Sequence, residues 1–380
     1  MPVALNIKPD LIQWAISRAG YEQGEFFDKF PRAKGWLEEG KNPTAAQLRD
    51  FAKKAHVPFG YLFLQEPPRE ELPIPFFRTV SGEVNQVGVN LRDTILNLQK
   101  RQDWIRNYLI EQGEERLNFI GKFTPQDQIA EVVQSIRNEL GLELDWASQH
   151  PNWQKALDHL AEKIEEVGIY IIFNSVVDNN THRPITVEEC RGFVLCDEYA
   201  PFLFVNSADS KSAQMFTIAH ELAHLWIGES AGFDFRQLQP FQNEVETFCD
   251  AVAAEFLVPQ TRFQSKWEQT QDFEALAKFF KVSQIVIARL ALDTRKISRE
   301  AFFEFYNDYM AAFKQRKEKQ GDGGNFYATL RKRLNARYFS AVHRAVKENK
   351  LLYKHAYELT GLKGNTYHEA VKENTNTRTL

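Results

Sequence analysis

The sequence predicts a mostly helical α+β fold, in which one small β-sheet is flanked by helical domains. Short runs of β-branched and aromatic residues stand in the middle of the chain, at residues 168–173, 192–196 and 202–205. Apolar residues recur at helical spacing before and after these runs. The length of 380 residues is enough for two or three domains with hydrophobic cores of their own.

Composition shifts divide the chain into seven predicted segments. Within the first, we expect one helix that ends at Gly20, a second over 24–37 and a third that is capped by Thr44. Four prolines then predict an extended linker. Helices are also expected over 210–227 and 242–257. The segments are 1–66 (short helices), 67–90 (linker), 91–166 (helical), 167–262 (the sheet and two helices), 263–313 (helical), 314–324 (a charged, flexible linker) and 325–380 (helical).

Charge and cysteine content exclude several protein classes. The net charge of −4 gives no global attraction to nucleic acid or to anionic membranes. Cys190, Cys196 and Cys249 lack the spacing of a disulfide framework or of a metal site, which indicates a reducing compartment. The N-terminus shows no secretory signal, and no apolar run is long enough to span a bilayer. We therefore expect a cytoplasmic protein with no membrane association.

The pentad His220-Glu221-Leu222-Ala223-His224 has the spacing of a zinc-binding helix. Residues four apart share one helix face, so both imidazoles can reach a single zinc ion. Glu221 lies outside this ligand set but can reach a water molecule on the metal and take its proton during attack on a peptide carbonyl. Taken alone, the pentad is also compatible with a pair of buried core histidines.

A carboxylate on the next helix is the predicted third ligand. Residues 243–259 form an amphipathic pattern, and Glu246 and Asp250 lie together beside its apolar stripe. Glu246 suits a two-histidine, one-glutamate zinc site, and Asp250 suits an acceptor that orients a ligating histidine. A solvated helix edge is the alternative. Glu244 falls on the far side of the helix, Cys249 fits the core, and Ser230 stands where another class of zinc peptidase has a third histidine.

Other features of the predicted site are less specific. The run 202–206 precedes the pentad helix, and an exposed strand edge there would let an extended peptide bind through main-chain hydrogen bonds. No oxyanion-stabilising residue can be chosen from sequence. Tyr199, His182 and Arg191 are in the right region of the chain only.

Residues 168–260 resemble the ImmA/IrrE family of metallo-endopeptidases. The matching motifs are Arg191-Gly192-Phe193, the run 200–206, the run 216–224 and the run from Glu246 to Pro259. Asp250 departs from the family pattern, which usually has asparagine there. The resemblance implies a zincin-like core with zinc on His220, His224 and Glu246 and with Glu221 as the base. It also implies a protein substrate, and members of the family are known or thought to cut transcriptional repressors.

The resemblance extends to residues 8–64, which look like a degenerate helix-turn-helix of the Xre type. Lys29, Arg32, Lys34 and Lys41 could contact phosphates, but five acidic residues lie among them, and a helical bundle for protein contacts is slightly favoured. Residues 276–290 form a second candidate helix pair, and the basic residues at 331–337 most simply form a solvated helix face. The leading hypothesis is a zinc endopeptidase that cleaves a regulatory protein. The alternative is a DNA-binding regulator or an antitoxin with a toxin partner and a structural or conditionally active zinc site.

Overall fold

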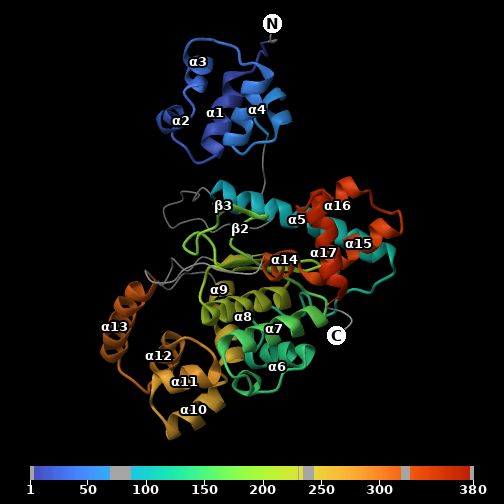
Figure 1. Ribbon diagram of the computed structural model, residues 1–380. Helices are drawn as coiled ribbons and strands as arrows, with labels where there is room; N and C mark the ends of the chain where they lie inside the picture. The colour runs from blue at the N-terminus through green and yellow to red at the C-terminus, as the bar shows by residue number, and fades with distance from the viewer. Residues whose placement is uncertain (1–3, 69–86, 230, 234–243, 318–325, 377–380) are drawn as a thin grey trace. The chain divides into compact units, whose positions relative to one another are not determined.

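The computed structural model describes residues 4–68, 87–229, 231–233, 244–317 and 326–376 (Figure 1). These residues form two compact units, the first of which extends to Leu96 and the second from Asn97 onward. Of the helices in these ranges, none is long and apolar enough to cross a membrane. The predicted linker lies largely outside the described residues, at 69–86.

The first unit is a small helical bundle around an aromatic core. Phe26, Phe51 and Trp36 pack edge to face at its centre. The predicted helix over 24–37 is wrong as a single element, because the chain breaks at Phe30 and Pro31 into two helices of seven residues. The third predicted helix is confirmed, and Thr44 and Gln47 form its capping box. The elements are α1 (Pro9–Arg18), α2 (Gln23–Lys29), α3 (Arg32–Glu38), α4 (Ala45–Lys54) and η1 (Phe59–Phe63).

A four-stranded sheet with the order β1-β5-β4-β6 forms the centre of the second unit. Its strands are β1 (Tyr170–Asn174), β4 (Gly192–Leu195), β5 (Phe202–Asn206) and β6 (Ala231–Phe233). β5 pairs with β1 in parallel and with β4 antiparallel, and β4 pairs antiparallel with β6. The expectation of an exposed edge at 202–206 is therefore wrong, because both edges of β5 are already paired within the sheet.

Strands β1, β4 and β5 are buried on both faces, which accounts for their many phenylalanines. Leu203 and Val205 of β5 join the core that contains the helices on one side. The alternate residues Phe202 and Phe204 stack on Tyr170 and Phe193 at the other face. Figure 1 shows α7 (Trp153–Glu166), α8 (Lys211–Ile227) and α9 (Glu244–Leu257) on one side of the sheet. On the other side lies α5 (Val89–Glu111), which belongs to this unit from Asn97 onward.

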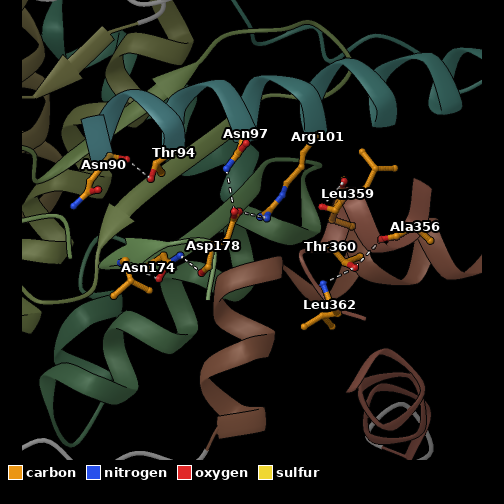
Figure 2. A network of polar contacts seen from close by, with 12 residues as sticks. Asn90, Thr94, Asn97, Arg101, Asn174, Asp178, Ala356, Leu359, Thr360 and Leu362 are labelled. Carbon is orange, nitrogen blue, oxygen red and sulfur yellow. Dashed lines mark hydrogen bonds and ion pairs between the residues drawn. The ribbon is translucent and has the colours of Figure 1, made fainter. Parts of the chain in front are cut away.

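A short hairpin and a set of helices complete the second unit. The hairpin, β2 (Val176–Val177) and β3 (Asn180–Pro184), turns through Asp178, which accepts hydrogen bonds from Asn97 and Arg101 of α5 (Figure 2). Since α13 continues to Lys317, the predicted linker over 314–324 begins too early. The helices are α5 (Val89–Glu111), α6 (Ile129–Leu140), η2 (Trp146–Gln149), α7 (Trp153–Glu166), α8 (Lys211–Ile227), α9 (Glu244–Leu257), α10 (Gln260–Gln269), α11 (Phe273–Phe280), α12 (Gln284–Asp293), α13 (Arg299–Lys317), α14 (Phe326–Leu334), α15 (Ala336–Lys347), α16 (Tyr353–Thr360) and α17 (Gly364–Asn376).

Helix α8 is capped at both ends and buried along most of its length. The Ser210 side chain accepts a hydrogen bond from the backbone N–H of Ala213 at its start. At its end Gly228 adopts a left-handed conformation with φ of 75°. The backbone N–H of Gly121 donates to the Leu225 carbonyl oxygen at 3.0 Å, so a crossing segment satisfies the last turn. Gly228 packs so closely on Gly121 that a Cβ there would lie 2.9 Å from the Gly121 Cα atom.

Helix α9 packs against α8 with one face and against α6. Its described residues begin at Glu244 and end at Leu257, close to the predicted 242–257. The buried Arg137 guanidinium donates to the carbonyl oxygen of Phe256 in the last turn. A cation at the C-terminal end of a helix satisfies a free carbonyl and interacts favourably with the helix dipole.

Candidate metal centre

Helices α8 and α9 bring His220, His224 and Glu246 together, and among the described residues these three form the only group with metal-ligand spacing. The Nε2 atoms of the two histidines lie 3.1 Å apart. Glu246 places one carboxylate oxygen 3.2 Å from His220 Nε2 and the other 3.4 Å from His224 Nε2. Two imidazole nitrogens and one carboxylate thus converge on a single point, which is the donor set of a two-histidine, one-glutamate zinc site.

Asp250 lies one turn after Glu246 and contacts the other nitrogen of the first histidine. Its Oδ1 atom is 2.9 Å from His220 Nδ1. The Asp250 side chain is 55% exposed, whereas that of His220 is fully buried. A carboxylate in this position fixes which nitrogen of the imidazole carries the proton and how the ring is oriented.

The acids of α9 make the centre favourable for positive charge. Burial lowers the pKa of His220, but hydrogen bonds with Asp250 and Glu246 outweigh burial and bring that pKa to about 10. Burial raises the pKa of Glu246, yet the two histidines bring it down to about 2. Burial lowers the pKa of His224. This balance suits a divalent cation held by one anionic and two neutral donors.

Glu221 is fully buried beside this cluster, and neither of its carboxylate oxygens has a hydrogen-bond partner among the described residues. Burial raises its pKa to about 8, with a smaller contribution from Glu246 in the same direction and an opposing one from His220. A buried carboxyl group without partners is costly to a fold, so its presence calls for an explanation in function.

Strand β4 approaches Glu221 closely at Gly192. A Cβ atom on Gly192 would lie 2.3 Å from Thr217 Cγ2, 2.8 Å from the Phe204 carbonyl oxygen and 3.6 Å from Glu221 Oε1. Gly192 belongs to the sequence motif Arg191-Gly192-Phe193, which does not indicate its role. A glycine inside a β-rich run indicates that another group approaches the backbone closely at that position, but the sequence does not identify the group.

The structure also describes the surroundings of the remaining candidates. Tyr199 accepts a hydrogen bond from Arg116 Nε at 3.2 Å, Arg191 pairs with Asp209 at 3.0 Å, and His182 is exposed on β3. Glu244 is exposed, as expected for the far side of α9. Cys249 is buried, and burial raises the pKa of its thiol, which fits a core residue. Ser230 lies outside the described residues.

The three cysteines are not equivalent. Cys190 and Cys249 are buried, whereas Cys196 is partly exposed at the end of β4. The Cys196 Sγ atom donates to the carbonyl oxygen of His224 at 3.8 Å. Cys196 is therefore adjacent to the backbone of one predicted ligand without belonging to the ligand set.

Comparison with known families gives this site a context. Residues 164–291 match the model of the IrrE N-terminal-like domain (Peptidase_M78). The matched stretch holds both helices of the candidate centre and the whole four-stranded sheet. The IrrE-like domain indicates a metallopeptidase of the ImmA/IrrE type and supports the resemblance drawn from the motifs. Residues 336–373 match a domain of unknown function (DUF8813). A search of curated proteins returned no match to the chain.

Three of the four candidate phosphate-contacting cations of the first unit pair with acids on the same surface. Lys29 pairs with Glu25 at 2.7 Å, Lys34 with Glu38 at 3.8 Å, and Lys41 with Glu39. Among the described residues, Arg32 has no ion-pair partner. Local neutralisation reduces the attraction of these three cations for phosphates.

Proposed function

We propose that this chain is a zinc-dependent endopeptidase with a zincin-like core, and that it cleaves a specific regulatory protein, a transcriptional repressor. One observation carries the proposal. His220, His224 and Glu246 converge within 4.8 Å of one another, and the buried Glu221 carboxylate lies beside them without a partner. A purely structural metal site has no use for such a carboxylate, because its coordination is complete.

In this proposal His220, His224 and Glu246 hold the ion, and Asp250 orients the His220 ring. Bound zinc supplies the Lewis acidity that polarises the peptide carbonyl and makes the attacking water more acidic. Glu221 accepts the proton of that water and passes it to the leaving amine. Because burial raises the pKa of Glu221, its carboxylate is a stronger base than an exposed glutamate.

Replacement of Glu221 by glutamine tests the catalytic part of the proposal. Glu221→Gln keeps the shape of the side chain but removes the base, so bound zinc should stay stoichiometric while cleavage falls by about 100-fold or more. Glu244→Gln removes an exposed carboxylate from α9 and should cleave like the wild type. The measurement is mass spectrometry of fragments from a repressor encoded beside the gene for this chain, together with zinc content by elemental analysis.

Two results would contradict the proposal. Undiminished cleavage by Glu221→Gln with zinc still bound would show that Glu221 is not the catalytic base. Cleavage of no protein by zinc-loaded wild type, when tested on the neighbouring repressor and on the proteome of the same cell, would leave a metal-binding protein without peptidase activity.

A further inference from the structure

The C-terminal helices α15, α16 and α17 form a compact group that the metal centre does not use. α15 packs against both α16 and α17 (Figure 1). Only residues 361–363 separate α16 from α17. Two helices joined by a turn of three or four residues, with a third helix packed behind them, is the arrangement of a helix-turn-helix. The sequence predicted only a helical region here.

The turn itself has the features of this motif. Gly361 adopts φ of +68°, a left-handed conformation that glycine takes at no steric cost. Leu362 is 3% exposed, so the middle of the turn is anchored in the core. The buried Thr360 hydroxyl donates to the Ala356 carbonyl oxygen at 2.7 Å and accepts from the Leu362 backbone N–H at 3.3 Å (Figure 2). These contacts fix the direction in which α17 leaves α16.

One buried tyrosine determines which face of α17 points outward. The Tyr367 ring lies 5.5 Å from that of Phe339 on α15 and 5.4 Å from that of Tyr357 on α16. Ala370, one turn later, is also buried. The opposite face is exposed, and its residues are Asn365, Thr366, His368, Glu369 and Lys372.

The net charge of residues 336–373, which include α15, α16 and most of α17, is opposite in sign to that of the whole chain. Residues 336–373 contain seven lysines and arginines against four glutamates, a net charge of +3, although the whole chain carries −4. Four of these cations are exposed and have no ion-pair partner among the described residues, namely Arg344, Lys347, Lys354 and Lys363. Lys354 lies at the start of α16 and Lys363 in the turn before α17. Exposed cations without acidic partners are the electrostatic requirement for binding DNA phosphates.

The other two helix pairs lack this combination. In α2, α3 and the segment that follows them, three of the four candidate cations pair with neighbouring acids. In the pair α11–α12 the exposed Lys278 pairs with Glu274 at 2.6 Å, and Arg289 pairs with Asp293 at 3.0 Å. The pair α16–α17 is therefore better suited to bind a polyanionic partner than α2–α3 or α11–α12.

We propose that α15–α17 are a helix-turn-helix module that binds double-stranded DNA, with α17 in the major groove. In this docking the first residues of the second helix meet the base edges. Asn365 can bond both polar atoms of an adenine, the Thr366 methyl group can contact thymine, and the exposed His368 one turn after Asn365 can donate a hydrogen bond to a base edge. Lys354 at the start of α16 and Lys363 in the turn contact the phosphates on either side.

The test uses the full chain and a library of randomised 30-base-pair duplexes. Sequences retained after repeated selection are measured by fluorescence anisotropy over a series of salt concentrations. The double change Asn365→Ala with His368→Ala is expected to weaken binding to the selected duplex by about tenfold or more and to relax its sequence preference. Lys354→Ala and Lys363→Ala should each weaken binding to every duplex and lower the slope of log K against log salt by about 1.

Matched variants control for changes in composition. Asn307→Ala with His182→Ala, and Lys155→Ala, replace the same residue types at exposed positions of α13, β3 and α7 and should bind like the wild type. All of these side chains are exposed, so the melting temperature should stay unchanged in each variant.

Four outcomes would overturn the proposal. They are retention of no duplex, unchanged affinity when Asn365 and His368 are replaced, equal competition by single strands of the selected sequence, and loss of binding on Arg32→Ala or Arg289→Ala while the α17 variants still bind.

Discussion

Helix α8 contributes the two histidines of the candidate metal centre and helix α9 contributes the glutamate, and the two helices differ in how deeply they are buried. α8 is buried on nearly every side and capped by Ser210 and Gly228. α9 has one buried face, and its acids stand at the edge, where the Asp250 side chain is 55% exposed. The histidines are thus fixed by packing, and the acids by their place on one helix. Substitutions of the α8 histidines should affect both stability and metal binding, whereas substitutions of the α9 acids should affect mainly metal binding.

The largest expected effect is loss of metal on removing either kind of ligand. His220→Ala and Glu246→Ala should each reduce zinc affinity by more than the roughly 10–100-fold that a supporting residue contributes. Only His220→Ala should also lower the melting temperature, because it leaves a hole in a buried helix face. Zinc content after dialysis and thermal unfolding measure the two effects. Glu244→Ala is the control, and normal zinc content in Glu246→Ala would show that another residue is the third ligand.

The tight contact between α8 and β4 should be sensitive to a single methyl group. Gly192→Ala is expected to destabilise the fold by about 3 kcal/mol, because the new Cβ would collide with Thr217 and with the Phe204 carbonyl oxygen. Thr217→Ser removes the methyl group that is 2.3 Å away, so the double variant should lose less stability than the two single changes together. Urea denaturation of the four proteins measures this coupling. Strict additivity would contradict the contact.

Asp250 tests whether an exposed acid of α9 acts through a buried histidine. Asp250→Ala should lower zinc affinity by about 10–100-fold and lower the melting temperature of the metal-free protein less than His220→Ala does. Asp250→Asn keeps an acceptor for His220 Nδ1 and should lose less affinity than Asp250→Ala. Competition with a zinc-binding dye gives the affinities. If both variants matched the wild type, the 2.9 Å contact would have no role in metal binding.

The smallest expected effect concerns the cap of α8. Ser210→Ala should destabilise the fold by about 1 kcal/mol, because the backbone N–H of Ala213 loses its acceptor. Ser210→Asn supplies another side-chain acceptor and should restore most of the stability. Neither change should alter zinc affinity at full folding, since the ligands lie more than two turns away. A loss of zinc in Ser210→Ala at a temperature where the protein is folded would show that α8 is less rigid than its burial indicates.

Local patterns in the sequence predicted much of this site. The spacing of His220 and His224, the stripe of α9 and its stop at Pro259 depend on residues close together in the chain. The order of the strands depends on pairings between distant segments, and for this reason β5 was wrongly expected at an edge. The contact of Gly192 with Thr217 also depends on such pairings. Pro31 is a local signal for a helix break, but the prediction of one helix over 24–37 gave more weight to the helical spacing of its apolar residues.

Cys196 is a native labelling site from which ligand binding at the candidate metal centre can be followed in solution. It is the one thiol of three that is not buried, and it touches the backbone of α8 at His224. A thiol-reactive fluorophore would therefore label a single position adjacent to the predicted ligands, with no cysteine introduced or removed. Its emission would report on zinc binding and on peptide engagement in the unmodified sequence.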